Sequence, residues 1–201
     1  MIYNVLANLA KSILTYRNRM DILNHHYIPN EPFIVTCSHK GWVDVVALGV
    51  SLYPKQIHFM AKKELFETIW TKKFLTSLNA FPVNRSNPGP NTIKIPVNRL
   101  KEGKIIGIFP SGTRTEEDVP LKRGAVTIAN LAKVPIVPAA YKGPTNLKGI
   151  LRGEKVQIIF GEPIDFSKKL KKEELQIETK RLTNIIQQLE LSLNKDKVIN
   201  M

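Results

Sequence analysis

Short, almost uninterrupted apolar runs alternate along this chain with stretches of helical periodicity, and this alternation strongly constrains the fold. The apolar runs predict six strands: Phe33–Cys37, Ile57–Ala61, Phe81–Val83, Lys104–Phe109, Val134–Ala139 and Lys155–Phe160. Between them, helical patterns cover residues 43–53, 63–78, part of 91–102 and 122–132. Strands that are apolar on both sides must be covered on both faces, which is typical of parallel sheets. We therefore expect an α/β fold, a single domain with a mainly parallel sheet flanked by helices.

The two ends of the chain both predict helices. Residues 171–196 carry a helical apolar stripe that is expected to pack on the body, and residues 2–18 form an amphipathic pattern. We expect an N-terminal amphipathic helical element over residues 1–30 and the main domain over residues 31–201, a length that fits one compact core. The N-terminal helix has two open interpretations: it covers the core, or it lies in a lipid interface. No apolar run approaches the roughly 18 residues of a spanning helix, so we expect any membrane contact to be peripheral.

The charge balance indicates an anionic partner. Thirty Lys and Arg residues against 17 Asp and Glu residues leave a formal net charge of +13. Such a surface attracts nucleic acid, an anionic membrane, or phosphorylated substrates and acidic carriers. The single cysteine, Cys37, excludes an internal disulfide framework and a multi-cysteine metal site, and it fits a reducing, cytoplasmic setting.

A histidine and an aspartate follow the first predicted strand. His39 and Asp44 are five positions apart, which would place them about 140° apart on a regular helix. They can meet if His39 precedes the helix and Asp44 lies in its first turn, with Gly41 allowing the bend. The carboxylate would then fix one tautomer of the imidazole and leave the other nitrogen free as a general base. The simpler interpretation is a loop histidine beside a carboxylate that interacts with the helix dipole.

Two arginines follow two further strands. Arg85 comes after Phe81–Val83, and Arg114 comes after Lys104–Phe109. If both emerge at the edge of the sheet where His39 lies, they could bind one phosphate through forked hydrogen bonds. Taken singly, each arginine is more often a surface ion-pair partner.

Four blocks of sequence resemble the ordered motifs of the glycerolipid acyltransferases. They are His39–Asp44, Phe81–Arg85, Phe109–Arg114 and Val134–Pro138, within a similarity that runs from about residue 31 to residue 163. The bacterial enzymes of this family that acylate 1-acylglycerol-3-phosphate (lysophosphatidic acid) are especially similar. The resemblance implies transfer of a fatty acyl chain from acyl-CoA or acyl-carrier protein to the 2-hydroxyl of that acceptor, giving phosphatidic acid.

The resemblance also implies roles for individual residues. His39 would be the general base and Asp44 would orient it, with no acyl-enzyme intermediate. Arg85 and Arg114 would bind the acceptor phosphate. Ser111, Gly112 and Thr113 would shape that pocket, and Val134–Pro138 would contribute to an apolar wall for the acyl chain. No cofactor or metal is implied, and an anionic membrane on its cytoplasmic face is the expected location.

One departure from the family pattern leaves the acceptor open. Ser111 stands where the family usually carries a glutamate that helps to position the acceptor, and Glu116 or Glu117 in the following loop could substitute for it. Another lysophospholipid or glycerol-3-phosphate therefore stays an alternative acceptor.

A thiol nucleophile, a metal site and a non-catalytic binding protein are the alternatives to this chemistry. Cys37 precedes His39 by two residues, which could suggest a thiol nucleophile, but a lone cysteine in an apolar strand is usually a buried hydrophobe. His25, His26 and His58 lack metal-ligand spacing. A non-catalytic basic protein that binds anionic lipid or nucleic acid is the remaining class, although no nucleic-acid-binding signature is present and we expect no nucleic-acid partner.

Overall fold

The computed structural model of this chain describes residues 2–16, 19–84, 89–109 and 119–195. Its helices are α1 (Ile2–Thr15), α2 (Val43–Ser51), α3 (Ile69–Ser77), α4 (Asn91–Lys101), α5 (Val119–Ala132), α6 (Leu147–Arg152) and α7 (Lys172–Lys195), with short 3-10 turns η2 (His25–Tyr27) and η3 (Lys63–Phe66). The strands are β1 (Met20–Leu23), β2 (Ile34–Cys37), β3 (Ile57–Lys62), β4 (Phe81–Val83), β5 (Ile105–Ile108), β6 (Ile136–Lys142) and β7 (Val156–Phe160).

Within these residues the strands form one sheet in the order β1-β7-β6-β2-β5-β3-β4. Strands β6, β2, β5, β3 and β4 pair in parallel, whereas β7 is antiparallel to β6, and β1 runs parallel to β7. The predicted α/β fold with a mainly parallel sheet is thus confirmed. The elements that were not predicted include β1, which joins the sheet from within the first 30 residues, and α6.

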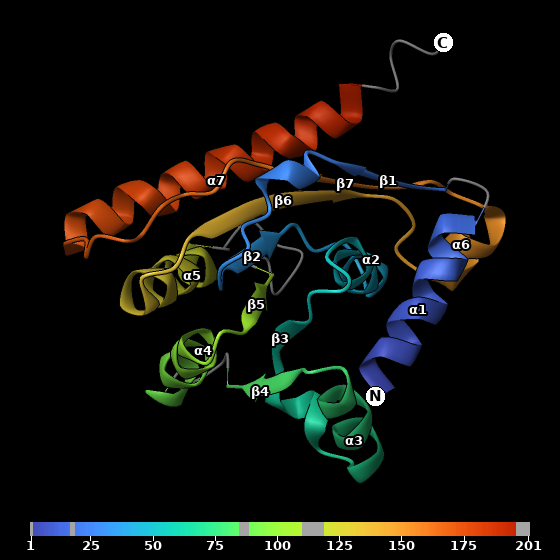
Figure 1. Ribbon diagram of the computed structural model, residues 1–201, viewed down its shortest axis with the longest axis horizontal. Coiled ribbons are helices and arrows are strands. Elements are labelled where there is room, and N and C mark those ends of the chain that lie inside the picture. Colours follow the sequence, from blue (N-terminus) through green and yellow to red (C-terminus); the bar gives the residue numbers. More distant parts are fainter. Residues whose placement is uncertain (1, 17–18, 85–88, 110–118, 196–201) are drawn as a thin grey trace.

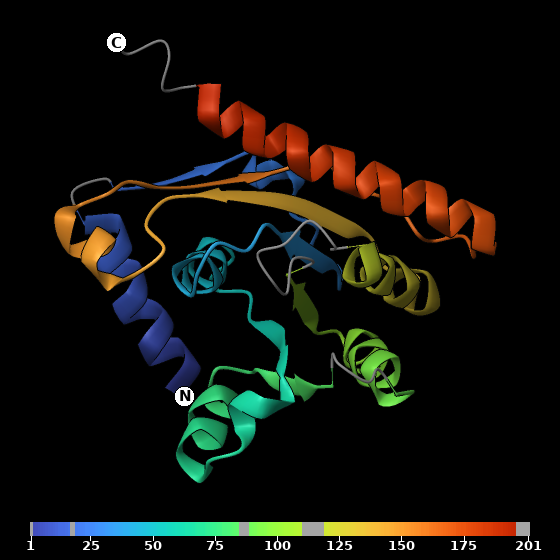
Figure 2. The same ribbon diagram turned by 180° about the vertical axis from the view of Figure 1, so that it is seen from behind.

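Helices cover both faces of the sheet (Figures 1 and 2). Helices α1 and α2 lie over one face, and α4, α5 and α7 lie over the other. The pleat of β2 divides its side chains between the two cores: Val35 and Cys37 belong to the cluster with α2, and Ile34 belongs to the cluster with α5 and α7. This two-sided burial explains why the central strands are apolar at most positions.

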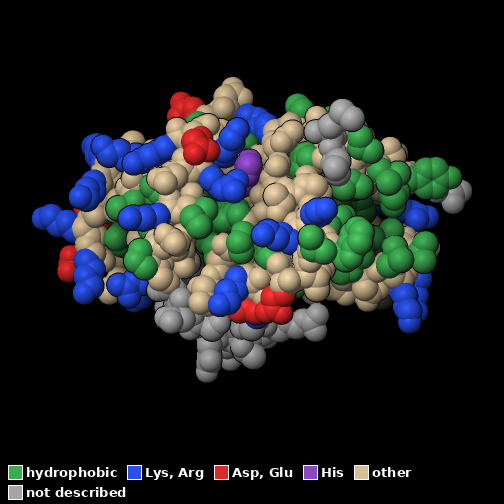
Figure 3. All heavy atoms as spheres, turned by 90° about the horizontal axis from the view of Figure 1, so that it is seen from below, with side chains coloured by type: hydrophobic (Ala, Val, Ile, Leu, Met, Phe, Trp, Pro, Cys, Tyr) green, Lys and Arg blue, Asp and Glu red, His purple; other side chains and the backbone are tan. Residues whose placement is uncertain are grey.

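Large apolar side chains remain exposed on α1 and α3. Seen from below, hydrophobic side chains gather on the side of the molecule that these two helices occupy (Figure 3). They include Val5, Leu9 and Ile13 of α1, Tyr16 directly after it, and Ile69, Trp70 and Phe74 of α3. Among the described residues, no helix combines the length and the hydropathy that a membrane crossing requires.

A half-buried histidine lies at the amino end of β3, away from the carboxyl ends of the parallel strands. Its Nδ1 accepts a hydrogen bond of 2.7 Å from the Arg99 guanidinium, which also lies over the Phe81 ring. Burial, together with the charges of Arg99 and Lys104, lowers the pKa of His58 from 6.5 to about 4. A protonated His58 would lose this hydrogen bond and face two cations, so the native state favours the neutral ring.

This arrangement predicts an acid-sensitive contribution to stability. Because the pKa of His58 is lower in the folded state, the unfolded chain binds more protons as pH falls from about 6.5 to about 4. The stability from neutral His58 is therefore present above pH 6.5 and is lost towards pH 4. In His58→Gln the amide oxygen can still accept from Arg99 without titrating, so its melting temperature should fall less, by a few degrees, between pH 7 and pH 4.5. Thermal unfolding followed by circular dichroism checks this, with exposed His26→Gln as the control that should follow the wild type.

Candidate active site

The candidate site begins where β2 ends. Strand β2 stops at Cys37, His39 follows in a short turn, and α2 begins at Val43, so that Asp44 lies in the first turn of the helix. Carboxyl ends of parallel strands are the usual place for ligand sites in α/β proteins. The chain bends at Gly41 between the histidine and the helix, which is the arrangement that lets residues 39 and 44 meet.

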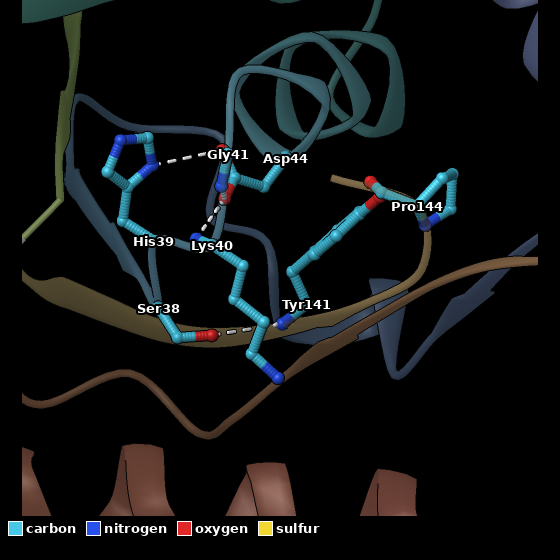
Figure 4. A network of polar contacts seen from close by, with 7 residues as sticks. All are labelled: Ser38, His39, Lys40, Gly41, Asp44, Tyr141 and Pro144. Carbon is cyan, nitrogen blue, oxygen red and sulfur yellow. Dashed lines mark hydrogen bonds and ion pairs between the residues drawn. The ribbon is translucent and has the colours of Figure 1, made fainter. Parts of the chain in front are cut away.

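The Asp44 carboxylate binds the residues of the turn that precedes α2. One carboxylate oxygen accepts hydrogen bonds from the backbone amides of Lys40, at 2.5 Å, and Gly41, at 2.9 Å. The other oxygen lies 3.1 Å from His39 Nδ1 (Figure 4). The Asp44 side chain has no exposed surface, whereas 34% of the His39 side chain is exposed. The buried carboxylate is therefore fully engaged and holds an imidazole that still reaches solvent.

This geometry defines what the imidazole can do. An ionised carboxylate only accepts hydrogen bonds, so His39 Nδ1 donates its proton to Asp44. The lone pair of Nε2 is then free to accept a proton from a bound group. The structure thus brings His39 and Asp44 together in the form that a general base requires.

Further contacts, from β6 and the loop that follows it, hold the turn between β2 and α2. Tyr141 in β6 donates its buried hydroxyl to the Pro144 carbonyl at 2.6 Å, and its backbone amide donates to Ser38 Oγ at 3.3 Å (Figure 4). The Thr145 carbonyl of the same loop lies so close to Gly41 that a β-carbon there would overlap it. Glycine at position 41 is required by this close approach.

Two other predicted motifs lead towards the same edge of the sheet. Phe109, the first residue after β5, is buried, and its ring centroid lies 5.0 Å from that of His39. Strands β4 and β5 run parallel to β2 in one sheet, so their carboxyl ends also lie at this edge. The predicted site residues beyond these strands lie outside the described residues: Arg85, Ser111, Gly112, Thr113 and Arg114.

An apolar cavity of about 470 Å³ opens beside His39. Its walls come from α1, α2, β3, η3 and α3 and from loop residues that include His39 and Phe109. Its lining includes Leu6 and Ala10 of α1, Val46 of α2, Phe59 of β3 and Leu75 of α3. Phe59 stacks on Phe109 within this lining. Such a hollow, lined by apolar side chains and reached by few polar groups, suits an extended hydrocarbon ligand.

The source of these walls differs from the sequence-based expectation. None of the residues that line this cavity comes from Val134–Pro138, so this segment does not contribute to its walls. Strand β6 pairs with β2, whereas the cavity lies beside β3, two strands further along. The role of α1 and α3 was missed, although the apolar spacing of Tyr3, Leu6, Ala7 and Ala10 was visible.

Competing chemistries find no support in the described residues. Cys37 is fully buried in the core beside α2, and burial raises the pKa of its thiol, which is the opposite of what a thiolate nucleophile needs. No group of three or more His, Cys, Asp or Glu side chains in the described ranges is arranged to hold a metal ion.

Comparison with known proteins shows which family the chain is similar to. A family model described as "Acyltransferase" matches residues 19–142. A 1-acyl-sn-glycerol-3-phosphate acyltransferase of Bacillus subtilis is 50% identical over 197 residues, covering 96% of this chain and 99% of the relative. One of the same name from Streptococcus pneumoniae is 39% identical over 200 residues, covering 94% and 74%. The crystal structure of the 1-acyl-sn-glycerophosphate (LPA) acyltransferase PlsC from Thermotoga maritima superposes with a TM-score of 0.71 at 21% identity, covering 96% of this chain and 79% of that one.

These matches establish the class of protein to which the chain belongs. The chain is an acyltransferase and belongs to the acyltransferase family. The relatives that match it along most of their length carry one specific name, 1-acyl-sn-glycerol-3-phosphate acyltransferase. The similarity of the solved structure adds the fold, since its sequence identity is low.

Gly41→Ala should separate the geometry of the turn from the stability of the fold. The added β-carbon cannot fit against the Thr145 carbonyl, so the turn must shift and carry the Lys40 and Gly41 amides away from Asp44. We expect kcat to fall by about 10²-fold, because displacements near 1 Å have effects of this size.

Gly103→Ala is the matched control. Gly103 has a φ of +81° at the opposite edge of the sheet, so alanine there should reduce stability by about 1–2 kcal/mol and leave kcat unchanged. Acyl transfer and thermal unfolding are measured for both variants. Equal kcat values for Gly41→Ala and wild type would show that the close approach does not position the histidine.

Proposed function

We propose that this protein transfers a fatty acyl chain from a thioester donor to the 2-hydroxyl of 1-acylglycerol-3-phosphate, giving phosphatidic acid. One observation carries the proposal: an imidazole held by a buried carboxylate opens onto an apolar cavity. The name shared by the relatives that match this chain at 50% and 39% identity supports the choice of acceptor.

The proposed chemistry needs one proton relay. His39 Nε2 takes the proton of the acceptor hydroxyl while its oxygen attacks the thioester carbonyl. The new C–O ester bond forms, the C–S bond breaks, and the thiolate recovers the proton from the imidazolium. Asp44 stabilises the transient positive charge on His39 through the Nδ1 hydrogen bond. The acyl chain passes directly from donor to acceptor, so no acyl-enzyme forms.

Cationic side chains would bind the acceptor phosphate. Arg85 and Arg114 follow β4 and β5, whose carboxyl ends lie at the edge of the sheet that carries His39. Forked guanidinium groups suit a phosphate dianion. Ser111, Gly112 and Thr113 precede Arg114 and would shape the same pocket.

The apolar cavity would take the acyl chain. Its lining extends from His39 to residues of α1 and α3, so a chain inside it can end at the proposed catalytic imidazole. The net charge of +13 suits both proposed donors, since acyl-CoA and acyl-carrier protein are each acidic.

The protein would act as a peripheral protein on the cytoplasmic face of an anionic membrane. The outward stripe of α1, formed by Val5, Leu9 and Ile13 and continued by Tyr16 directly after the helix, is 51–64% exposed. A helix with one apolar face on the protein and another facing outward is suited to lie in a lipid interface.

His39→Ala tests the assigned base. Loss of the base should lower kcat by about 10²- to 10⁴-fold, the usual contribution of general-base catalysis. Purified protein is assayed for phosphatidic acid and free thiol, with acyl-CoA and acyl-carrier protein as donors and with lysophosphatidate, glycerol-3-phosphate and other lysophospholipids as acceptors. His26→Ala, an exposed histidine in η2, is the control that should keep full activity. Turnover by His39→Ala close to the wild-type rate would refute the mechanism, and preference for another acceptor would reassign the substrate.

Arg114→Ala tests the phosphate contact. Loss of a charge-assisted hydrogen bond, about 1.5–3 kcal/mol, should raise the KM for lysophosphatidate about 10- to 100-fold and leave the donor KM unchanged. Arg152→Ala on α6 removes an exposed arginine and should leave both values unchanged. An unaltered acceptor KM in Arg114→Ala would exclude this residue from phosphate binding.

A further inference from the structure

Helix α3 and η3 carry an apolar surface of which only a part, Leu65 and Phe74, lines the cavity proposed for the acyl chain. We call Leu65, Ile69, Trp70 and Phe74 the α3 patch. Their exposed fractions are 52%, 64%, 80% and 56%. Tryptophan is usually well buried, so one with four-fifths of its surface exposed, next to three more large apolar residues, indicates an interaction surface.

The helix that carries the patch is lightly held by the protein. No side chain of α3 is fully buried, and the helix packs mainly against η3. A nine-residue helix has little stability of its own and usually depends on the burial of one face. Much of the apolar surface of α3 thus has no cover within the described structure.

The patch lies at the rim of the apolar cavity. Phe74 belongs to both, since it lines the cavity and remains 56% exposed. The α1 side chains Leu6 and Ala10 line the same cavity, and the outward stripe of α1 continues the apolar surface beyond them. Exposed apolar side chains thus border the cavity on two separate elements (Figure 3).

The charges around the patch favour an anionic surface. Four exposed lysines, Lys62, Lys63, Lys72 and Lys73, flank it, against two acidic residues, Glu64 and Glu67. Lysines beside a bilayer are attracted to anionic headgroups, and aromatic side chains prefer the headgroup level.

We infer that the α3 patch docks into an anionic lipid bilayer, as a second contact beside α1, so that the cavity between the two helices opens towards lipid. A bilayer can cover both helices at once and still admit the lipid acceptor that the proposed function requires. A protein seated across both helices would close the cavity instead. The inference deepens the proposed function by giving its substrate a route from the membrane.

Tryptophan fluorescence tests the patch directly. The chain has two tryptophans, so in Trp42→Phe the remaining emission comes from Trp70. Vesicles of phosphatidylglycerol and phosphatidylcholine are added, with and without bromine on the acyl chains. We expect a blue shift of Trp70 emission and quenching by the brominated lipid. Emission unchanged by vesicles would overturn the inference, as would emission that responds only to an acidic acyl-carrier protein.

Vesicle sedimentation tests the energetic role of the patch. Trp70→Ser should weaken binding to the same vesicles about tenfold or more, since it removes a large apolar side chain from the interface. The matched control is Ile177→Ser on α7, where the isoleucine is 64% exposed on another face of the molecule. It should bind as the wild type does. Equal affinities for Trp70→Ser and wild type, or equal losses in both variants, would overturn the inference.

A dispersed substrate keeps this inference distinct from the proposed function. With short-chain lysophosphatidate and acyl donor below their aggregation limits, Trp70→Ser should turn over within about twofold of the wild type, because Trp70 is not among the residues that line the cavity beside His39. A comparable loss on dispersed substrate and on vesicles would assign Trp70 to the active site instead. If the wild type fails to acylate any acceptor, the proposed function falls, while the fluorescence of Trp70 still decides the membrane contact.

Discussion

A carboxylate without any exposed surface organises the edge of the sheet that carries His39. Asp44 is shielded from water, and its charge is sustained by two backbone amides, by His39 and by its position in the first turn of α2. Without those donors, burial of the charge would be prohibitive. The same donors fix the path of the chain from β2 to α2, so the electrostatic requirement of Asp44 and the orientation of His39 are met by one turn.

The two faces of the sheet have separate roles. On the face with α4, α5 and α7 the helices complete an apolar core. On the other face, α2 supplies the core and the aspartate, while α1 and α3 leave the cavity between them. The ring of Phe109 lies against His39 and also lines that cavity, so the same side chain contacts the histidine of the turn and the apolar space beside it.

Much of this arrangement could be predicted from local sequence. Strands β2 to β7 consist mostly of apolar residues, and this made them recognisable. Strand β1 was missed because it is a four-residue edge strand that contains Asp21, whose charge is met by Lys155 at 2.6 Å. Helix α6 was missed because it is shorter than two turns, although its cap residue Asn146 and the left-handed Gly153 at its end were visible.

The site was predictable where its residues are neighbours in sequence and not where they come from distant elements. The His39–Asp44 contact follows from a five-residue spacing and one glycine. The cavity, in contrast, needs α1, α2, β3 and α3 to meet, and their order around the sheet is a long-range property. The resemblance therefore placed the apolar wall on Val134–Pro138, although β6 lies on the other side of β2 from β3.

Strands β7 and β1 run opposite to the other five strands, and this direction determines at which edge of the sheet α1 lies. Met20 pairs with Val156, and Gln157 pairs with Lys142 at the carboxyl end of β6. The start of β1 thus lies at the edge of the sheet that carries His39. Had β1 run in the direction of β2, the preceding helix would have emerged at the opposite edge of the sheet, where the parallel strands begin. Because β7 runs antiparallel to β6 and β1 follows the direction of β7, helix α1 enters the sheet at the edge where His39 lies, with its apolar face outward.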